Sequence, residues 1–211
     1  MNDVQQRLKD ISEIRGLMER SARFLSLSGL SGIGTGIVAF LGAWASYTYL
    51  VSEGIWENWE KGSFIISQIQ LLQLGGIALT ILFSALLVAI FFSVRLARVK
   101  NLPIWGSPAR YLLLNLSVPL VSGGGFCILL AYHNFVGMVA PATLIFYGLA
   151  LHSASKYTLR EVGYLGISEV VLGLIAACWV GNAWTILLFW TLGFGVLHIL
   201  YGVFMYLKYE R

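Results

Sequence analysis

The two ionisable residues placed deepest in apolar sequence stand in matching glycine frames. The stretches GISEVVLG (Gly166 to Gly173) and GVLHILYG (Gly195 to Gly202) both read G-x-x-Z-x-x-x-G. The central residue is Glu169 in the first stretch and His198 in the second. A carboxylate beside an imidazole can take up and release a proton or contact a cation, so these residues predict a proton- or cation-responsive site.

The glycines have a structural part in this prediction. In a helix, the residues three before and four after a given position share its face, so Gly166 and Gly173 flank Glu169. The glycines of the second frame flank His198 in the same way. Small residues let two helices approach closely, and a polar group in such a groove faces protein instead of lipid. We therefore predict that the glycines make room for a buried polar pair and shield it.

The two ionisable residues also share one depth. Glu169 lies nine residues after Arg160, and His198 lies nine residues before Leu207. At a rise of about 1.5 Å per residue, both lie about 13 to 14 Å inside an apolar layer about 30 Å thick. A tight turn around Gly181-Asn182 joins their two helices, which predicts a contact between Glu169 and His198 across an antiparallel hairpin.

A third apolar run, YLLLNLSVPLVSGGGF, contains helix-disrupting residues at the same level. Pro119 cannot donate a hydrogen bond to the carbonyl of Asn115, and Gly123, Gly124 and Gly125 follow it. We expect this run to kink or partly unwind, which would free carbonyl groups next to the polar pair. The side chains expected to add donors and acceptors to the site are those of Asn115, Ser117 and Ser122.

The first apolar run has a ridge of small residues formed by Ser28, Gly32 and Gly36. Such a ridge permits close helix packing. We expect Gly32, which lies nine residues after Arg23, to pack against the helix of Glu169. The same ridge predicts the interface of a homo-oligomer.

Composition places these runs in a membrane protein. The chain has 58% hydrophobic and only 11% charged residues, whereas about a quarter of a soluble domain is charged. Six runs are long enough to span a bilayer, and the absence of water there requires them to be helices. The expected spans are 25–50, 71–94, 111–132, 135–154, 162–180 and 184–207. The predicted fold is all-α: one six-helix transmembrane domain, residues 24–211, built from three in-out-in hairpins.

The basic residues predict the orientation. Thirteen of the 14 lysines and arginines fall in segments that an even number of spans places on one side, namely 1–23, 95–110, 156–160 and 208–211. By the positive-inside rule both termini are cytoplasmic, in a plasma membrane or bacterial inner membrane. The net charge of +4 therefore reflects topology and affinity for the lipid bilayer, and it does not indicate a nucleic-acid partner.

The leading segment, residues 1–23, has apolar residues at steps of three and four with charges between them. This pattern predicts an amphipathic helix in the cytoplasmic headgroup layer, either as an anchor or as a docking surface for a cytosolic partner. The stretch ERSARFLSLSGLSG resembles small multi-span bacterial membrane proteins that have no assigned activity. The resemblance covers little more than the first span and implies no functional residues.

Three classes of function are compatible with these features. A transporter or permeation unit would use Glu169 and His198 as its midplane site. A membrane scaffold, sensor or regulatory subunit would use the same pair only to hold its helices in register. An intramembrane enzyme is the least favoured, because the sequence has no nucleophile motif, no H-E-x-x-H and no metal-spaced cluster. We expect no cofactor and no metal, and Cys127 and Cys178 have no C-x-x-C neighbour.

Overall fold

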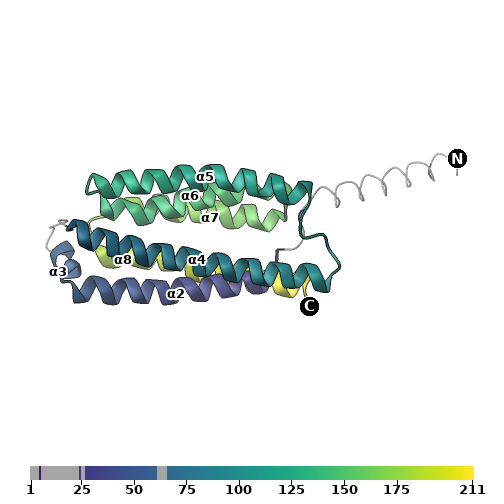
Figure 1. The fold of residues 1–211 in the computed structure, drawn as a ribbon, viewed down its shortest axis with the longest axis horizontal. Helices are drawn as coiled ribbons and strands as arrows, with labels where there is room; N and C mark the ends of the chain where they lie inside the picture. Colours follow the sequence, from purple (N-terminus) through teal and green to yellow (C-terminus); the bar gives the residue numbers. More distant parts are fainter. Residues whose placement is uncertain (1–4, 6–23, 25–26, 61–65) are drawn as a thin grey trace.

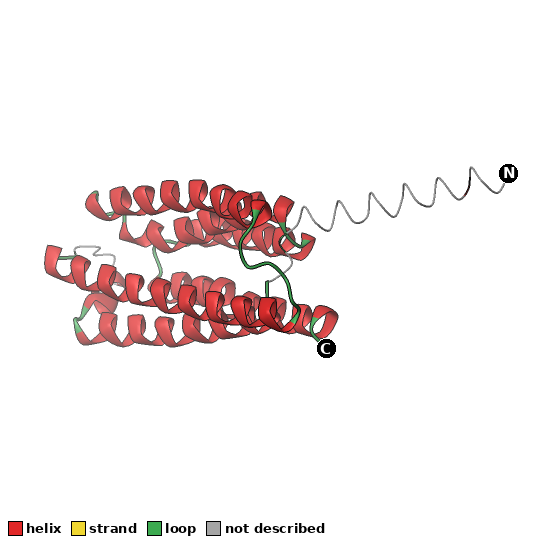
Figure 2. Cartoon of the chain, turned by 45° about the vertical axis from the view of Figure 1, so that its right-hand side comes forward, coloured by secondary structure: helices red, strands yellow, loops and turns green. Residues whose placement is uncertain are grey.

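The computed structural model describes residues 5, 24, 27–60 and 66–211. Regular structure in this part of the chain is helical, without a strand, which confirms the all-α prediction (Figure 2). The elements are α2 (Gly29–Ser52), α3 (Ile55–Glu60), α4 (Gln68–Val99), α5 (Ser107–Tyr132), η1 (Val136–Met138), α6 (Val139–Ala154), η2 (Ser155–Tyr157), α7 (Arg160–Ala177), α8 (Ala183–Thr191), η3 (Leu192–Leu197) and α9 (His198–Tyr209). The predicted amphipathic helix at 1–23 lies outside the described residues, apart from residue 5.

Polar residues fix where several of these helices begin. Ser67 and Gln70 form a capping box at the start of α4. The Asn182 side chain accepts a hydrogen bond from the Thr185 amide at 3.0 Å and starts α8 directly after the turn from α7. These side chains pair backbone amides that the first turn of a helix leaves without a partner. A new helix can therefore begin within a few residues of the previous one.

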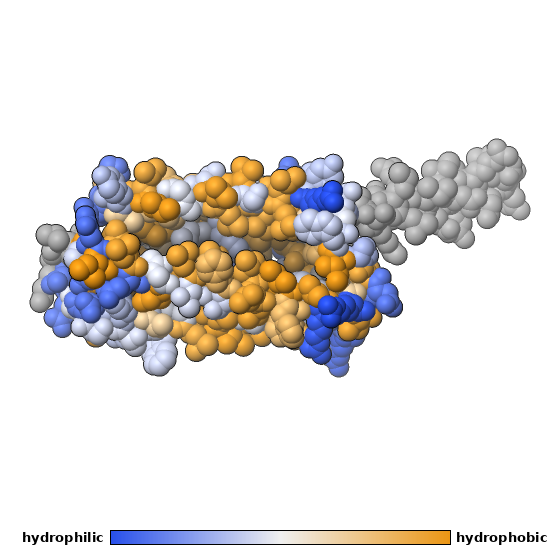
Figure 3. Space-filling model, in the orientation of Figure 1, coloured by the Kyte–Doolittle hydropathy of each residue, from blue (hydrophilic) through white to orange (hydrophobic). Residues whose placement is uncertain are grey.

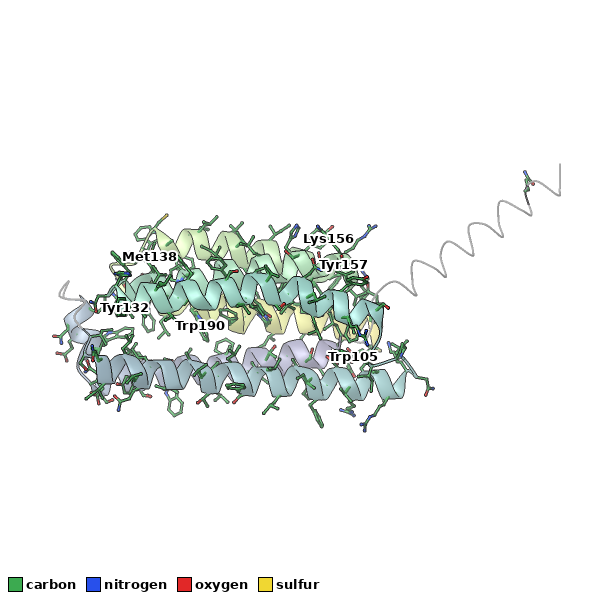
Figure 4. All side chains as sticks on the ribbon, turned by 45° about the horizontal axis from the view of Figure 1, so that its top comes forward. Trp105, Tyr132, Met138, Lys156, Tyr157 and Trp190 are labelled. Carbon is green, nitrogen blue, oxygen red and sulfur yellow. The ribbon has the colours of Figure 1, made fainter. Side chains whose placement is uncertain are left out.

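The helices form two groups that lie side by side (Figure 1). In one group α6 packs between α5 and α7, and in the other α2 packs between α4 and α9. The elements α8, η3 and α9 form one continuous helical segment. This segment also contacts α6 and α7 and so connects the two groups. Figure 4 shows Trp190, at the end of α8, in the interior between the groups, with Tyr132 and Met138 at one end of the bundle and Lys156 and Tyr157 at the other.

Five helical segments among the described residues are long and apolar enough to cross a membrane. They are α2, α4, α5, Val136–Tyr157 and Ala183–Tyr209. The remaining predicted span, 162–180, corresponds to α7, which has 18 residues. Arg160, Glu161 and Glu169 make α7 too polar to qualify. Apolar side chains cover much of the flank of the bundle, and strongly hydrophilic ones gather near its ends (Figure 3).

Helix α2 packs closely on both of its neighbours through glycine. A Cβ at Gly34 would lie 2.5 Å from the Val88 side chain of α4. On another face, a Cβ at Gly32 would lie 2.9 Å from the Cα atom of Gly202 in α9. The expectation that Gly32 packs against the Glu169 helix is therefore wrong, because the small ridge of α2 meets the helix that carries His198. Since α9 covers this ridge, a homo-oligomer would have to use another surface.

The sequence predicts that the third span kinks or partly unwinds, and the unwinding is wrong. Helix α5 is continuous from Ser107 to Tyr132 with Pro119 inside it. A proline removes only one hydrogen bond from a helix that is otherwise intact, and membrane helices tolerate this loss. Gly123 fits against Phe146 of α6, where an added Cβ would lie 2.4 Å from the Phe146 Cβ, so this glycine serves helix packing.

Candidate functional site

The contact that the sequence predicted between Glu169 and His198 is present. Nδ1 of His198 lies 3.4 Å from Oε1 of Glu169. Glu169 projects from the middle of α7, and His198 is the first residue of α9. The carboxylate has an exposed fraction of 0% and the histidine one of 5%, so both ionisable groups are enclosed by the helices.

Two hydrogen bonds orient the imidazole. Nδ1 of His198 lies 3.1 Å from the carbonyl oxygen of Gly193, and Nε2 lies 2.9 Å from the hydroxyl of Tyr147 in α6. A carbonyl oxygen can only accept, so Nδ1 must carry the hydrogen in this arrangement. Nε2 of the neutral ring then accepts the hydrogen bond that the Tyr147 hydroxyl donates.

The Glu169 carboxylate, unlike the imidazole, lacks hydrogen bonds within the part of the chain that the structure describes. Among the described residues, neither of its oxygens has a hydrogen-bond partner. An ionised carboxylate can accept about four hydrogen bonds, and burying it without them is expensive. Among the described residues, His198 is the ionisable group that forms an ion-pair contact with Glu169, at 3.4 Å. The energy of the Glu169 carboxyl therefore depends strongly on its surroundings.

A π-helical segment lies next to the Glu169 carboxylate. η3 (Leu192–Leu197) widens the helix between α8 and α9, and π-helical turns of this kind occur often at functional sites. Its Gly193 contacts the carboxylate directly, since an added Cβ would lie 2.5 Å from Oε2 of Glu169. A larger residue here would require the Glu169 and Leu144 side chains to shift, and the same glycine supplies the carbonyl that orients His198.

Aromatic rings close the site. The ring of Phe194 lies 5.1 Å from that of Tyr147 and 5.9 Å from the imidazole of His198, measured between centroids. Trp190 extends the stack, with its ring 4.9 Å from Phe194. These close spacings fill the volume next to the polar pair with side chains, so the site as arranged suits a proton better than a bulky ligand.

The glycine frames allow close packing as predicted, and each frame packs against an outer neighbour of its helix. A Cβ at Gly166 would lie 2.6 Å from the Gly148 carbonyl oxygen, and one at Gly173 would lie 2.7 Å from Ile145, so both face α6. In the other frame, Gly195 faces Phe40 and Gly202 faces the backbone of Gly29 to Ile33, both in α2. The frames therefore hold the two helices of the polar pair against outer neighbours and do not join them to each other.

The polar residues predicted from the third span lie away from this site. Each bonds a carbonyl of its own helix: Asn115 bonds Tyr111, Ser117 bonds Leu114 and Ser122 bonds Val118. Gly124 and Gly125 face open space, since an added Cβ would meet nothing within 4 Å. The structure thus brings Glu169 and His198 together and leaves the α5 residues out.

The described residues contain no group of three or more His, Cys, Asp or Glu side chains that could hold a metal ion. Cys127 and Cys178 are free thiols.

Comparisons with known proteins give no closer guide to the site. No family model, no curated protein and no solved structure matches the chain. The resemblance of the first span to small bacterial membrane proteins remains a prediction. Function therefore has to be argued from the geometry of the pair.

Sequence reasoning missed Tyr147, Gly193 and Phe194. A depth argument could have found the first, because Tyr147 lies nine residues before Lys156, the same interval that places Glu169 after Arg160. Gly193 and Phe194 depend on the π-helical turn, which changes the face on which each residue lies. The regular helical spacing used in the sequence argument does not hold through that turn.

Proposed function

We propose that this protein is a six-span membrane transporter or permeation unit that is controlled by proton uptake and release at Glu169. The observation that carries the proposal is the complete burial of a carboxylate whose oxygens have no hydrogen-bond partner among the described residues. Losing or gaining a proton changes the energy of such a group far more than that of a solvated one. A conformation that gives the carboxylate water or donors is therefore favoured in one protonation state only.

The packing around the pair supports such a coupling. Glycine contacts hold α7 to α6 and α9 to α2, whereas α7 makes much sparser contact with η3 and α9. Glu169 and His198 face each other across this sparser seam. A relative shift of the two helix pairs would change the distance between the carboxylate and the imidazole without breaking the glycine contacts. Tight helix pairs that move against each other are a common basis of alternating access.

The membrane arrangement is part of the proposal. Helix α7 runs alongside α6 and joins it through the short η2 turn, so we propose that α7 is the sixth span despite its charged residues. Its most polar side chain, Glu169, faces protein. We further propose that both termini face the cytoplasm of a plasma or bacterial inner membrane, because nearly all basic residues fall in segments on that side.

The experiment measures proton flux into reconstituted vesicles under an imposed pH gradient, with a pH-sensitive dye in the vesicle interior. The unmodified protein should pass protons in a pH-dependent manner. Glu169→Gln keeps the size of the side chain but cannot titrate, so it should fold normally and lose the pH-dependent flux. Ser168→Ala is the matched control, because Ser168 is exposed on the same helix and bonds only the Tyr164 carbonyl.

His198→Ala supplies a second measurement. The imidazole lies 3.4 Å from the carboxylate and is ionisable, so its removal should shift the pH midpoint of the flux. Unchanged flux in Glu169→Gln would eliminate the titrating-carboxylate mechanism.

A scaffold or regulatory subunit is the second candidate function. Two observations favour the scaffold function, namely the close ring packing around His198 and the glycine contacts of both frames. Both are also expected in a bundle that stays rigid. A complete lack of proton flux in the unmodified protein, together with loss of a partner on deletion of residues 1–20, would put this function first.

A further inference from the structure

Two tyrosines, Tyr147 and Tyr201, lie near the buried pair on the side of a charged cluster at one end of the bundle. Tyr147 bonds His198 directly, at 2.9 Å. Tyr201 of α9 lies one turn beyond His198, and both tyrosines pack against the same apolar cluster of Leu151, Val162 and Leu165. Val162 of this cluster directly follows Glu161 in α7, so the cluster that both tyrosines contact extends to the charged end of the helix. Both tyrosines therefore lie in the contact region between α6, α7 and α9.

The charged cluster is built from the start of α7 and the end of α9. Oε1 of Glu161 accepts hydrogen bonds from Lys208 at 2.5 Å and from the Tyr209 hydroxyl at 2.8 Å. Glu161 and Glu169 are eight residues apart on α7, which corresponds to about 12 Å along the helix. Lys208 is exposed, so this end of the series reaches solvent.

We propose that Tyr201 and Tyr147 carry protons between the Glu161–Lys208–Tyr209 cluster and Glu169. The proposal rests on the function proposed above, because it names the route by which the titrating carboxylate is reached. It also names the side of entry, which is the end of the bundle that holds the C-terminus (Figure 1).

The transfer balances proton by proton. A proton arrives at the Tyr147 oxygen from the side of Tyr201 while the hydroxyl proton of Tyr147 passes to Nε2 of His198, along the 2.9 Å hydrogen bond. Nδ1 of His198 then releases its own proton to Oε1 of Glu169, which is 3.4 Å away. The ring ends neutral in its other tautomer, with its hydrogen on Nε2, and Glu169 ends as a carboxylic acid. Return of the proton reverses each step.

Two links in this series have no direct hydrogen bond, namely that between Tyr201 and Tyr147 and that between Tyr201 and the Glu161 cluster. The proposed route includes a rotation of the half-buried Tyr201 ring or bridging water molecules at these links, since water-mediated bonds are nearly as favourable as direct ones.

The ionisable groups of the proposed route come from three helices, and Lys100 at the end of α4 also donates a hydrogen bond to the Tyr209 carbonyl. Tyr147 comes from α6, Glu161 and Glu169 from α7, and His198, Tyr201, Lys208 and Tyr209 from α9. Helix α8 has no ionisable residue, and those of α2 are Tyr47 and Tyr49, near its far end.

Toward the opposite end of the bundle, the side chains next to the pair are Leu144, Phe194 and Trp190, which cannot pass a proton along. The nearby hydroxyls of Thr143 and Thr191 bond carbonyls of their own helices. The polar series therefore leaves the pair in one direction.

Time-resolved infrared spectroscopy on the full chain in vesicles tests the route. The carbonyl stretch of the protonated Glu169 carboxyl is followed after a light-triggered release of protons, and its absence in Glu169→Gln assigns the band. Tyr147→Phe and Tyr201→Phe keep their rings and should still show the band at equilibrium. Each should slow its appearance by at least about tenfold, because a relay hydroxyl has been removed. Tyr164→Phe is the matched control, since Tyr164 is an exposed tyrosine of α7, and it should leave the rate unchanged.

The outcomes separate the route from the proposed function. If the band in both tyrosine variants rises at the unmodified rate, the route is wrong, even where proton flux still requires Glu169. If the tyrosine variants slow the band but the unmodified protein passes no protons, the route stands and the transport proposal fails. If Glu169 shows no change of protonation between about pH 4 and pH 9, both proposals are wrong. Thermal midpoints equal to that of the unmodified protein show that the variants are folded.

Discussion

Replacing Gly202 by alanine should loosen the bundle at the contact between α2 and α9. An added Cβ at this position would lie 2.5 Å from the backbone nitrogen of Ile33 and 2.6 Å from the carbonyl oxygen of Gly29. Both atoms belong to the backbone of α2, so neither can rotate away as a flexible side chain would. The helices must separate, and the shortest distance is about 0.9 Å below the 3.4 Å at which ordinary contact begins.

The size of the effect follows from a matched comparison. Overpacking of this kind costs about 1 to 3 kcal/mol. Alanine is also a better helix former than glycine by about 1 kcal/mol, which partly offsets that cost. Gly124→Ala makes the same chemical change inside α5, where an added Cβ meets nothing within 4 Å. Because the helix propensity is gained in both variants, the difference between them isolates the overpacking cost.

Thermal unfolding in one detergent, followed by circular dichroism, provides the measurement. Gly202→Ala should unfold several degrees below Gly124→Ala, which should equal or exceed the unmodified protein. Equal midpoints for the two alanine variants would refute the close approach of α2 and α9 and with it the role assigned to the glycine frame. Since His198 lies one helical turn before Gly202, the same variant should also change proton uptake at Glu169.

Two further predictions concern the ends of the bundle. Partial burial would raise the pKa of the Glu161 carboxyl, but hydrogen bonds from Lys208, its own backbone and Tyr209 outweigh this and lower that pKa. The stability that these hydrogen bonds contribute is complete above the ordinary pKa of 4.5 and is lost as the pH falls through the lowered pKa of the folded protein. Acid should therefore lower the thermal midpoint of the unmodified protein more than that of Glu161→Gln. Equal acid sensitivity of the two proteins would contradict this prediction. The orientation can be tested by labelling single cysteines in a variant that lacks Cys127 and Cys178. Arg98→Cys should react with an impermeant thiol reagent from the cytoplasmic side, and Glu57→Cys should react from the opposite side. Labelling of Glu57→Cys from the cytoplasm would overturn the orientation.

The sequence predicts the all-helical fold because long apolar runs that suit a bilayer leave few alternatives. Apolar runs of sufficient length must be helices, and short polar turns such as Gly181-Asn182 force neighbouring helices to be antiparallel. Length and composition alone do not decide whether α7 is a membrane span. Three charged residues in 18 make it too polar by composition, yet the most deeply placed of them faces protein. Composition alone cannot tell a charge buried against protein from one exposed to lipid.

The site was only partly predictable, for a different reason. Depth along a helix can be counted, and counting brought Glu169 and His198 to one level. Which face of a helix meets which neighbour depends on all the helices together. The Gly166 frame therefore packs on α6 and the small ridge of α2 packs on α9, although each pattern fits several partners. The proline in α5 was misleading because a single lost hydrogen bond does not break a membrane helix.

The positions of the glycines explain how the polar pair is enclosed and how it could respond to protonation in the proposed function. Gly166 and Gly173 fix α7 to α6, and Gly202 fixes α9 to α2, through contacts that allow almost no adjustment. The space between the two fixed pairs is filled by larger side chains and by one carboxylate that lacks hydrogen bonds among the described residues. In the function proposed above, rigid contacts on the outside and this carboxylate at the seam would concentrate a change of protonation into relative movement of the helix pairs. If the glycines instead joined α7 directly to α9, a proton on Glu169 would act against a contact too tight to move.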